Sequence, residues 1–451
     1  MCLLKRKSNA SGLVLSPDGI RREENGSGRL SETMTALWNY KTEEREMKKT
    51  ISVLALASIF TAGSAMASGW RIPEQSVDST AKAGANIASS TRGDVSYYNP
   101  ANMSWMENSW HTEVDATYIY LAPITYKDGR KSFFDGESES EHFFVPTGFL
   151  VSPSYNGFRF GMALVAPNGL SKRWESRYPK AFAREFSLEV IEMNPTLSYN
   201  IQDKVSFAAG ARMIYAKATV KSDASGLGRP LSREMDGDTV EWGWNAAVSY
   251  KPMDKLNISA TYRSNVDLDF DDTARLNLMG FRINLGTKVS VPSPAVFAFS
   301  VAYDVLDNLN VELTWDRTFW SEYENLDFDF TPRVPGNPFE PAQVRDWDDT
   351  DAFRIGLTYV LDGNWTLMAG FGYDKNPEPD RTVGFELPDS DAWLYSLGFQ
   401  YKVNEDMDIG VAALYDYKES RTVKVSPRDR VYGEFTDAAA FLLTVGLNYR
   451  F

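Results

Sequence analysis

The sequence predicts an all-β protein, a 14-stranded antiparallel transmembrane β-barrel with an N-terminal plug, or hatch, in its lumen. Long runs of residues alternate between apolar side chains and small or polar ones, which is the pattern of a strand with one greasy face. Short turns and long connections follow these runs in strict alternation. A secretory signal precedes them, and no other stretch is apolar enough to form a spanning helix.

The signal contains "ISVLALASIFTAGSAMA" at residues 51–67, which follows the basic "MKK". A basic start, a short apolar middle and an Ala-Met-Ala end are typical of a cleavable secretory signal. The apolar part is too short and too rich in small residues for a stable spanning helix. We therefore expect residues 47–67 to be removed and the mature chain to begin at Ser68.

Residues 1–46 are polar and carry no apolar period. Because a signal peptide acts at an N-terminus, we interpret them as a non-native or mis-assigned leader, with translation starting at Met47; a functional cytoplasmic leader is the alternative. The single cysteine, Cys2, lies in this leader. The mature chain thus has no disulfide framework, thiolate metal site or cysteine nucleophile.

The alternation is clear at the C-terminus, where large apolar residues occupy one parity of residues 438–451 and small or polar ones the other. A soluble sandwich also alternates, but these runs reach the ~9–11 residues needed to cross a bilayer. Tyr and Trp lie at their ends, as in a membrane aromatic girdle. The fourteen predicted strands are 109–121, 142–152, 157–167, 188–200, 204–220, 239–250, 255–266, 290–304, 309–320, 351–361, 365–375, 391–402, 407–418 and 438–451.

Each even strand joins the next through a short turn, as in "SYNIQDKVSF" at 198–207, while odd strands are followed by long loops. Short periplasmic turns and long extracellular loops are typical of outer-membrane barrels. A barrel is required because an open sheet edge cannot exist in lipid. We therefore place residues 109–451 in the outer membrane of a Gram-negative bacterium. The chain ends in "YRF", and the terminal Phe451 is expected to be read by the barrel-assembly machinery.

Composition excludes several classes of function. The formal net charge of −14 leaves no basic stripe for nucleic acid. Only His111 and His142 are present, and no serine follows either one at a recognisable catalytic spacing, so an enzyme is not expected. No cofactor or metal is predicted. A monomer is expected.

Residues 68–108 do not alternate, and they combine many alanines with Trp, Tyr and Met. A free linker is rarely so apolar, so we expect this segment to form the hatch. Its "GWRIPEQS" and "YYNPA" resemble the N-terminal hatch of the FadL family of outer-membrane transporters. Further matches, among them "APNGLSKRW", "NPTLSYNIQDKVSFAAGARMIYAKA" and "DWDDTDAFRIG", extend the resemblance over the whole mature chain.

The resemblance implies a fourteen-stranded barrel that takes up long-chain fatty acids and similar hydrophobic molecules without an energy source. Ligand would be caught by extracellular loops, pass to an apolar pocket and leave sideways at a kink in the third strand. Asn99, Pro100 and Ala101 match the hatch motif said to meet that kink, and an ordinary turn is the alternative. Gly161 in the third strand is a candidate kink point, or a glycine that merely faces the lumen.

The long loop at 168–187 mixes aromatic residues with cations at helical spacing, so short amphipathic helices are expected there. An apolar face ringed by cations suits capture of a fatty carboxylate, and binding of acidic lipopolysaccharide is the competing use. The candidate capture residues are Leu170, Trp174, Tyr178, Phe182 and Phe186.

Four basic residues are candidate partners for a ligand carboxylate. Lys217 resembles a family position near the pocket, although strand parity would point it outward unless a bulge intervenes. Arg212, Arg263 and Arg354 face inward on parity alone. They could also simply balance acidic residues in the lumen such as Glu241 and Glu312.

Other functions remain open. An aromatic-hydrocarbon channel of the same family is hard to separate from a fatty-acid channel, although it should have fewer basic residues near the pocket. A general porin would lack the alanine-rich hatch.

Overall fold

The structure is a computed structural model that describes residues 69–424 and 430–451. The chain divides into two units, Met1–Ile59 and Phe60–Phe451, and every described residue belongs to the second. The predicted leader at 1–46 and signal at 47–67 lie outside the described residues, so both stay predictions.

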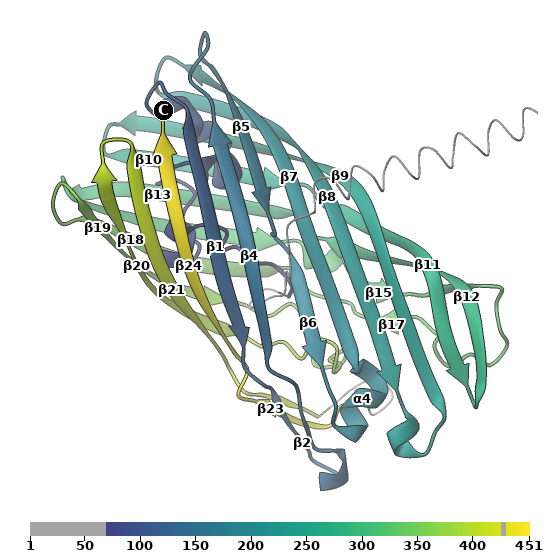
Figure 1. Cartoon of the computed structure of the whole chain (residues 1–451). Helices are drawn as coiled ribbons and strands as arrows, with labels where there is room; N and C mark the ends of the chain where they lie inside the picture. The colour runs from purple at the N-terminus through teal and green to yellow at the C-terminus, as the bar shows by residue number, and fades with distance from the viewer. Residues whose placement is uncertain (1–68, 425–429) are drawn as a thin grey trace, which may run out of the picture. The chain divides into compact units, whose positions relative to one another are not determined.

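Fourteen antiparallel strands close into a barrel, with the first strand, β1, paired to the last, β24 (Figure 1). Each predicted strand corresponds to an observed one, which confirms the predicted fold class. The strands are β1 (His111–Leu121), β4 (Glu141–Val151), β5 (Phe158–Val165), β7 (Glu185–Ile201), β8 (Val205–Asp223), β9 (Leu231–Met253), β10 (Leu256–Arg263), β13 (Val296–Leu306), β14 (Leu309–Thr318), β18 (Thr350–Val360), β19 (Trp365–Asp374), β20 (Ala392–Asn404), β21 (Met407–Lys418) and β24 (Ala439–Arg450).

One predicted long loop, 267–289, is instead mostly strand. β11 (Val266–Leu278) and β12 (Phe281–Ser293) form a hairpin that extends the wall beyond β10 and β13 (Figure 1). Its first strand begins with the alternating "DLDF" at 267–270, inside the predicted loop, whereas the end of its second strand, "SVPS" at 290–293, falls in the predicted strand 290–304. β9 is correspondingly long, with 23 residues, and pairs with both β10 and β11.

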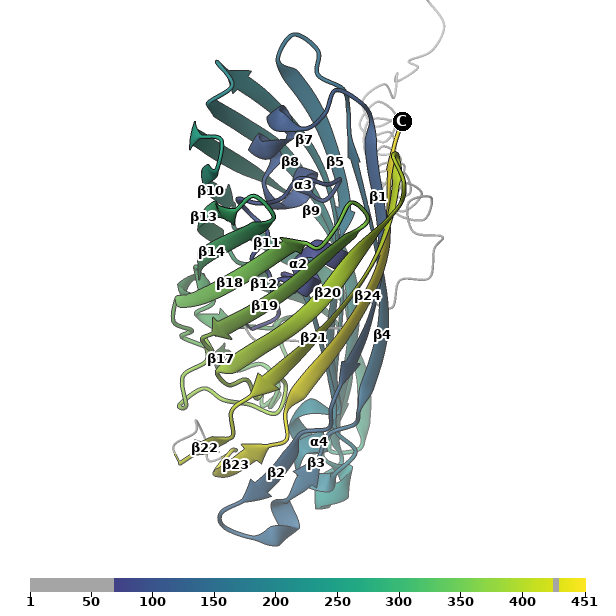
Figure 2. The same ribbon diagram turned by 90° about the vertical axis from the view of Figure 1, so that its left-hand side faces the viewer.

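Most of the other long loops contain short elements at the same end of the barrel, here called the long-loop end. Figure 2 shows β2, β3, β22 and β23 beside α4 at this end, away from the C-terminus. The elements are β2 (Thr125–Asp128), η2 (Ser132–Phe134), β3 (Gly136–Glu137), β6 (Gly169–Arg173), α4 (Arg177–Ala183), η3 (Ser225–Leu227), η4 (Trp320–Glu322), β15 (Asn325–Leu326), β16 (Asp329–Thr331), β17 (Gln343–Val344), β22 (Arg421–Val423) and β23 (Gly433–Thr436).

The outer face of the barrel is apolar, as the alternation predicts. Trp242 and Trp244 of β9 are exposed on it, whereas Asn245 points inward and is buried. Tyrosines before the short turns, including Tyr199, Tyr250 and Tyr303, are also exposed on this face. Such a ring is suited to the lipid headgroup region. Among the described residues, no helix has the length and apolarity to cross a membrane.

Residues 69–108, called the hatch below, pack against the inner face of the barrel (Figure 2). They form α2 (Val77–Ala81), α3 (Val95–Tyr98) and η1 (Pro100–Trp105), and the hydroxyl of Ser76 accepts the Ser79 N–H to cap α2. Small residues let hatch and wall approach closely. A Cβ on Gly398 of β20 would lie 2.5 Å from that of Ala81.

Glu312 of β14 fixes the middle of the hatch. Its carboxylate accepts the backbone N–H groups of Ile87, Ala88 and Ser89 at 2.7, 2.8 and 2.9 Å. Hydrogen bonds from three adjacent amides to one buried carboxylate stabilise this turn strongly. Glu312 thus positions the hatch and does not act as a counter-charge for a lumen arginine.

Candidate functional site

The wall is interrupted in its third strand, between β5 and β6. Both segments pair with β7, but the register shifts across residues 166–168. On the other side, β4 pairs with β5 only from Gly148 to Val151. The β4 residues 141–147 therefore have no ladder partner on this side among the described residues. We call this gap, between 141–147 and 166–168, the wall break.

Gln75 of the hatch supplies the hydrogen bonds that the wall break lacks. Its amide Nε2 donates to the Ala166 carbonyl at 2.9 Å, and its Oε1 accepts the Ala166 N–H at 2.8 Å. From the opposite edge, the Thr147 hydroxyl donates to the Gln75 carbonyl at 2.8 Å. One hatch residue thus satisfies backbone groups that would otherwise be buried without partners.

The hatch backbone also pairs with the break as a short strand. The Ile72 N–H donates to the Pro167 carbonyl, and the Gly169 N–H donates to the Trp70 carbonyl, each at 2.8 Å. Between these bonds, Arg71 and Asn168 form an antiparallel bridge. We call residues 69–76 the arm; it closes the wall break by β pairing.

A polar contact bounds the break at its long-loop side. The Ser171 hydroxyl donates to the Glu141 carboxylate at 2.6 Å, and Arg173 lies 3.1 Å from the same oxygen. Within the gap, β4 carries Pro146, which has no N–H to leave unpaired and is therefore tolerated at a strand edge. The Glu141 contact therefore marks where the wall break ends on the long-loop side.

The expected kink point, Gly161, lies inside regular β5, opposite Val151 and Thr196. The interruption comes later, at 166–168, so the predicted position is wrong. Gly161 has a different use, because a Cβ there would lie 2.5 Å from Met103 of the hatch.

Asn99 donates to the Ile87 carbonyl and to Ser249 of β9, both at 2.9 Å. Its side chain serves the hatch and β9, while Pro100 begins η1 and Ala101 packs on Ala208 and Ala247. The wall break is satisfied by Gln75, which sequence reasoning missed. A gating role for Asn99, Pro100 and Ala101 stays a prediction.

A small apolar cavity of about 30 Å³ lies against the arm at the long-loop end. Trp70 forms one side of it, and barrel strands and loops form the rest. Its lining is almost wholly hydrophobic and comprises Trp70, Leu170, Phe186, Ser187, Leu188, Ala218, Val220, Phe270, Val289, Val291, Tyr323, Leu326 and Phe328. We call it the apolar pocket.

Trp70 is held there by packing against three aromatic side chains. Its ring centroid lies 4.6 Å from that of Trp320, 5.2 Å from Tyr323 and 5.1 Å from Trp347. None of the three indole N–H groups has a hydrogen-bond partner among the described residues. The tip of the arm is thus held by apolar and aromatic packing, which a hydrophobic ligand could replace.

Arg212, Arg263 and Arg354 point into the barrel, as parity predicts. Arg212 and Arg354 are buried, and Arg263 is partly buried. Glu192 pairs with both Arg212, at 2.9 Å, and Arg263. Arg354 pairs with Asp316 and, at 2.9 Å, with Asp374. Each guanidinium already has a protein carboxylate, so these pairs favour charge balance over ligand binding.

Lys217 is exposed on the outer face, opposite Glu189 and Asp238 in the neighbouring strands. No register shift occurs around it on β8, so parity holds and it does not point into the apolar pocket. The bulge that would turn Lys217 toward the pocket is absent, so the structure does not support Lys217 as a carboxylate partner there. Sequence reasoning missed Arg233, which is buried and stacked between Phe328 and Phe339, at 4.9 and 5.5 Å.

The predicted capture residues separate into two groups. Leu170 on β6 and Phe186 on β7 line the apolar pocket. Trp174, Tyr178 and Phe182 instead gather around Phe385 in a cluster at the long-loop end.

The expected helix exists as α4, with Tyr178 and Phe182 on it. Trp174 precedes it and is fully buried, and its indole N–H donates to the Phe385 carbonyl at 2.8 Å. Trp174 therefore anchors loops and offers no open surface for first contact with a ligand. Capture by this loop stays a prediction.

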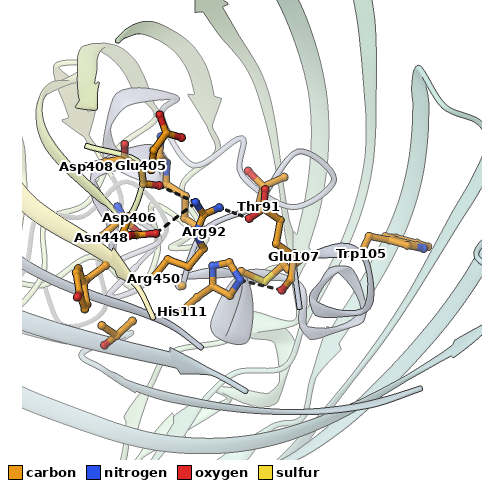
Figure 3. A pocket seen from close by; sticks show the side chains of 14 residues that line it. Thr91, Arg92, Trp105, Glu107, His111, Glu405, Asp406, Asp408, Asn448 and Arg450 are labelled. Atoms are coloured by element: carbon orange, nitrogen blue, oxygen red, sulfur yellow. Dashed lines mark hydrogen bonds and ion pairs between the residues drawn. The ribbon is translucent and has the colours of Figure 1, made fainter. Parts of the chain in front are cut away.

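Two larger cavities, of about 350 and 300 Å³, lie at the short-turn end. Figure 3 shows the first, where Arg92 of the hatch pairs with Asp408 at the start of β21. Glu405 of the preceding turn and Arg450 at the end of β24 also line it. His111 also lines it. Their polar linings suit water better than an apolar ligand, so size does not mark the hydrophobic site.

The hatch carries two buried acids with raised pKa values. Burial raises the pKa of Glu74 to about 7, although Arg354 opposes the shift. Burial, with Asp78 adding to it, raises the pKa of Asp94 to about 6. Their ionisation near neutral pH opposes docking of the hatch.

A sequence profile described as "Outer membrane protein transport protein (OMPP1/FadL/TodX)" matches residues 58–451. The chain belongs to this family. It is similar to the long-chain fatty acid transport protein of Escherichia coli O6:H1, with 26% identity over 89% of this chain and 98% of the relative. Outer membrane protein P1 of Haemophilus influenzae is 26% identical over 89% of this chain and 99% of its own length.

Solved structures show the same fold. A FadL homologue of Pseudomonas aeruginosa superposes with a TM-score of 0.74 at 19% identity, covering 85% of this chain and 99% of the other. The toluene transporter TodX of P. putida gives 0.65 at 16% identity, covering 83% and 98%. The protein is therefore an outer-membrane transport protein of a Gram-negative bacterium and not an enzyme. Its short-turn end is periplasmic and its long-loop end extracellular.

Proposed function

We propose that this FadL-family protein takes up long-chain fatty acids and similar hydrophobic molecules by passive diffusion. Ligand enters among the extracellular loops, occupies the apolar pocket and leaves sideways through the wall break when the arm moves. A hydrocarbon chain kept out of water along this route retains ~0.8 kcal/mol per buried CH2. A wide aqueous channel would not preserve that gain.

The observation that carries the proposal is the double position of Trp70. Its side chain lines the apolar pocket, and its carbonyl accepts a bond from Gly169 at the wall break. A ligand that displaces the ring also weakens the pairing that closes the wall. Pocket occupancy and opening are thereby coupled through one short segment.

The names of relatives support a hydrophobic ligand, since one is a long-chain fatty acid transporter. Aromatic hydrocarbons are the second candidate, and the cluster of Trp70, Trp320, Tyr323 and Trp347 favours planar rings. A general porin is poorly supported, because hatch residues contact both β8 and β21 across the lumen.

Two further partners are proposed. The backbone of Phe451 exchanges hydrogen bonds with Trp110 at 2.9 and 3.0 Å, which places the terminal Phe at the seam where the barrel closes. This position is compatible with recognition by the barrel-assembly machinery before closure. The cations of the extracellular loops would meet lipopolysaccharide.

The test is uptake by a strain that lacks its own fatty-acid transporter. Cells producing the protein should accumulate labelled oleate and grow on oleate as sole carbon source, and the empty vector should not support either. Labelled toluene is measured in parallel, and a hydrophilic sugar tests for porin activity. Toluene uptake without oleate uptake would favour the aromatic channel, and sugar uptake alone would favour the porin.

A further inference from the structure

A second apolar cavity, of about 30 Å³, lies at the extracellular end, where β1, β6, β21 and β24 approach one loop. It is separate from the apolar pocket, with which it shares no lining residue. Leu387, which lines it, belongs to the same hydrophobic cluster as Trp70 and Leu170 of the apolar pocket. Most of its lining is aliphatic, from Leu121, Ile124, Leu387 and residues 438–440. Two lysines, Lys172 and Lys418, and one acid, Asp389, are the charged residues of its lining.

Lys418 is accounted for within the protein. Its ammonium lies 2.5 Å from the carboxylate of Asp389. The other oxygen of Asp389 accepts the N–H of Gly69, at the start of the arm, at 3.1 Å. The charge of Lys418 is therefore neutralised locally, and Asp389 has little capacity left to pair with a second cation.

Lys172 is different. It is 3% exposed, and no hydrogen bond or ion pair joins its ammonium to any described residue. Its neighbours Ser171 and Arg173 both engage the same oxygen, Oε2, of Glu141. The other oxygen, Oε1, has no hydrogen-bond partner among the described residues, but it makes no ion pair with Lys172 either. An ammonium buried without a partner is unfavourable, and an anionic ligand would relieve that cost.

The position of Lys172 indicates the shape of that ligand. Lys172 and Leu170 are two residues apart on β6 and so lie on the same face, about 7 Å apart. Leu170 lines the apolar pocket. An anionic group at Lys172 would thus lead directly to an apolar surface. A cavity of about 30 Å³ has room for one or two water-sized groups, which fits a carboxylate better than a bulky head.

We propose that Lys172 binds the carboxylate of an amphiphile whose hydrocarbon chain runs over Leu170 into the apolar pocket. This inference rests on the proposed function and assigns its ligand class, since an aromatic hydrocarbon offers no anion to this ammonium. The site lies beside the long-loop end of the wall break, next to the Glu141 contact.

The test compares oleate with methyl oleate, which has the same chain and no charge. Binding of each is measured by titration of the purified protein in amphipol. Lys172→Met should weaken oleate binding about tenfold and leave methyl oleate unchanged. Lys172→Arg should retain oleate binding. Lys204→Met, at an exposed short turn, is the matched control and should have no effect.

Arg233→Met tests the competing cation beside Phe328. The inference is overturned if this change, and not Lys172→Met, weakens oleate binding. It is also overturned if Lys172→Met weakens both ligands equally, or neither, in protein that remains heat-modifiable on gels. If the unaltered protein binds neither ligand, the proposed function fails and the site fails with it. If the unaltered protein binds both oleate and methyl oleate and Lys172→Met changes neither affinity, only the Lys172 site is refuted and the proposed function stands.

Discussion

Gln75 and Ala166 exchange two hydrogen bonds, at 2.8 and 2.9 Å, across the boundary between hatch and wall. Both residues are almost completely buried. A side-chain amide here mimics the backbone of a neighbouring strand, offering one donor and one acceptor. The wall break is thus sealed by a group that can leave without breaking the barrel ladder.

We predict that Gln75→Ala loosens the arm while the barrel stays folded. It leaves the N–H and carbonyl of Ala166 without their partner, at a cost of ~1–3 kcal/mol. Hydrogen exchange at the arm amides, including Ile72, should be faster, and oleate delivery should change. Gln343→Ala in an extracellular loop is the matched control. Unchanged exchange would show that ring packing alone holds the arm.

Gly161→Val should disturb the hatch. A Cβ at this position would lie 2.5 Å from both the Met103 sulfur and the Thr196 hydroxyl, so a larger side chain must displace the hatch or bend β5. We expect greater sensitivity of cells to a large antibiotic such as vancomycin. Gly363→Val is the control, because nothing lies within 4 Å of its added Cβ. Equal sensitivity of both variants would contradict the contact.

Docking of the hatch should weaken as pH rises, because of Glu74. Burial raises the pKa of this carboxyl to about 7, and Arg354 only partly compensates. A free carboxyl ionises near pH 4.5, so between about 4.5 and 7 the docked state holds a proton that the undocked state has lost. The docking free energy therefore declines through this range and reaches its lower limit above pH 7.

Glu74→Gln removes this dependence, so its hatch amides should exchange more slowly than those of the unaltered protein at pH 8. At pH 4 the two proteins should match. Rates are compared at one pH at a time, which cancels the intrinsic pH dependence of exchange. Asp94, whose pKa burial also raises, contributes a dependence that both proteins keep. Faster exchange in the variant at pH 8 would show that ionised Glu74 stabilises docking.

The barrel could be predicted because its cause is local. Residues that face lipid must be apolar, and the alternate residues that face the hatch are small or polar. Every strand therefore shows this alternation in its own sequence. The same parity correctly turned Arg212 inward and Lys217 outward. The hairpin of β11 and β12 could not be recognised in the same way, because it extends the wall beyond β10 and β13. No aromatic girdle marks the ends of its strands there.

The candidate site could not be predicted in the same way. The wall break results from a register shift between strands, which no single segment encodes, so Gly161 was an attractive but misplaced choice. The helical spacing of Tyr178 and Phe182 correctly indicated α4. The burial of Trp174 depends on Phe385, which belongs to a loop some two hundred residues later.

The arm can be fixed in place by a disulfide. Arg71 and Asn168 form an antiparallel bridge flanked by the Ile72 and Gly169 hydrogen bonds, so they are a non-hydrogen-bonded pair. Such pairs have Cα atoms about 4.5 Å apart, within the range of a disulfide. The sole cysteine of the sequence is Cys2. A chain that begins at Ser68, as predicted, and carries Arg71→Cys and Asn168→Cys would therefore have no other thiol.

If release needs movement of the arm, the oxidised double variant should bind oleate but fail to deliver it, and reduction should restore growth on oleate. The single variants control for loss of the Arg71 bond to Asp316, at 2.9 Å. A second pair, Ser104→Cys and Ser206→Cys, joins η1 to β8 where the hydroxyls lie 2.7 Å apart. That bond fixes the hatch but leaves the arm free, so delivery should persist. Normal delivery through a barrel whose Arg71→Cys and Asn168→Cys disulfide has formed would mean that ligand leaves by the lumen, past the polar cavities of the periplasmic end.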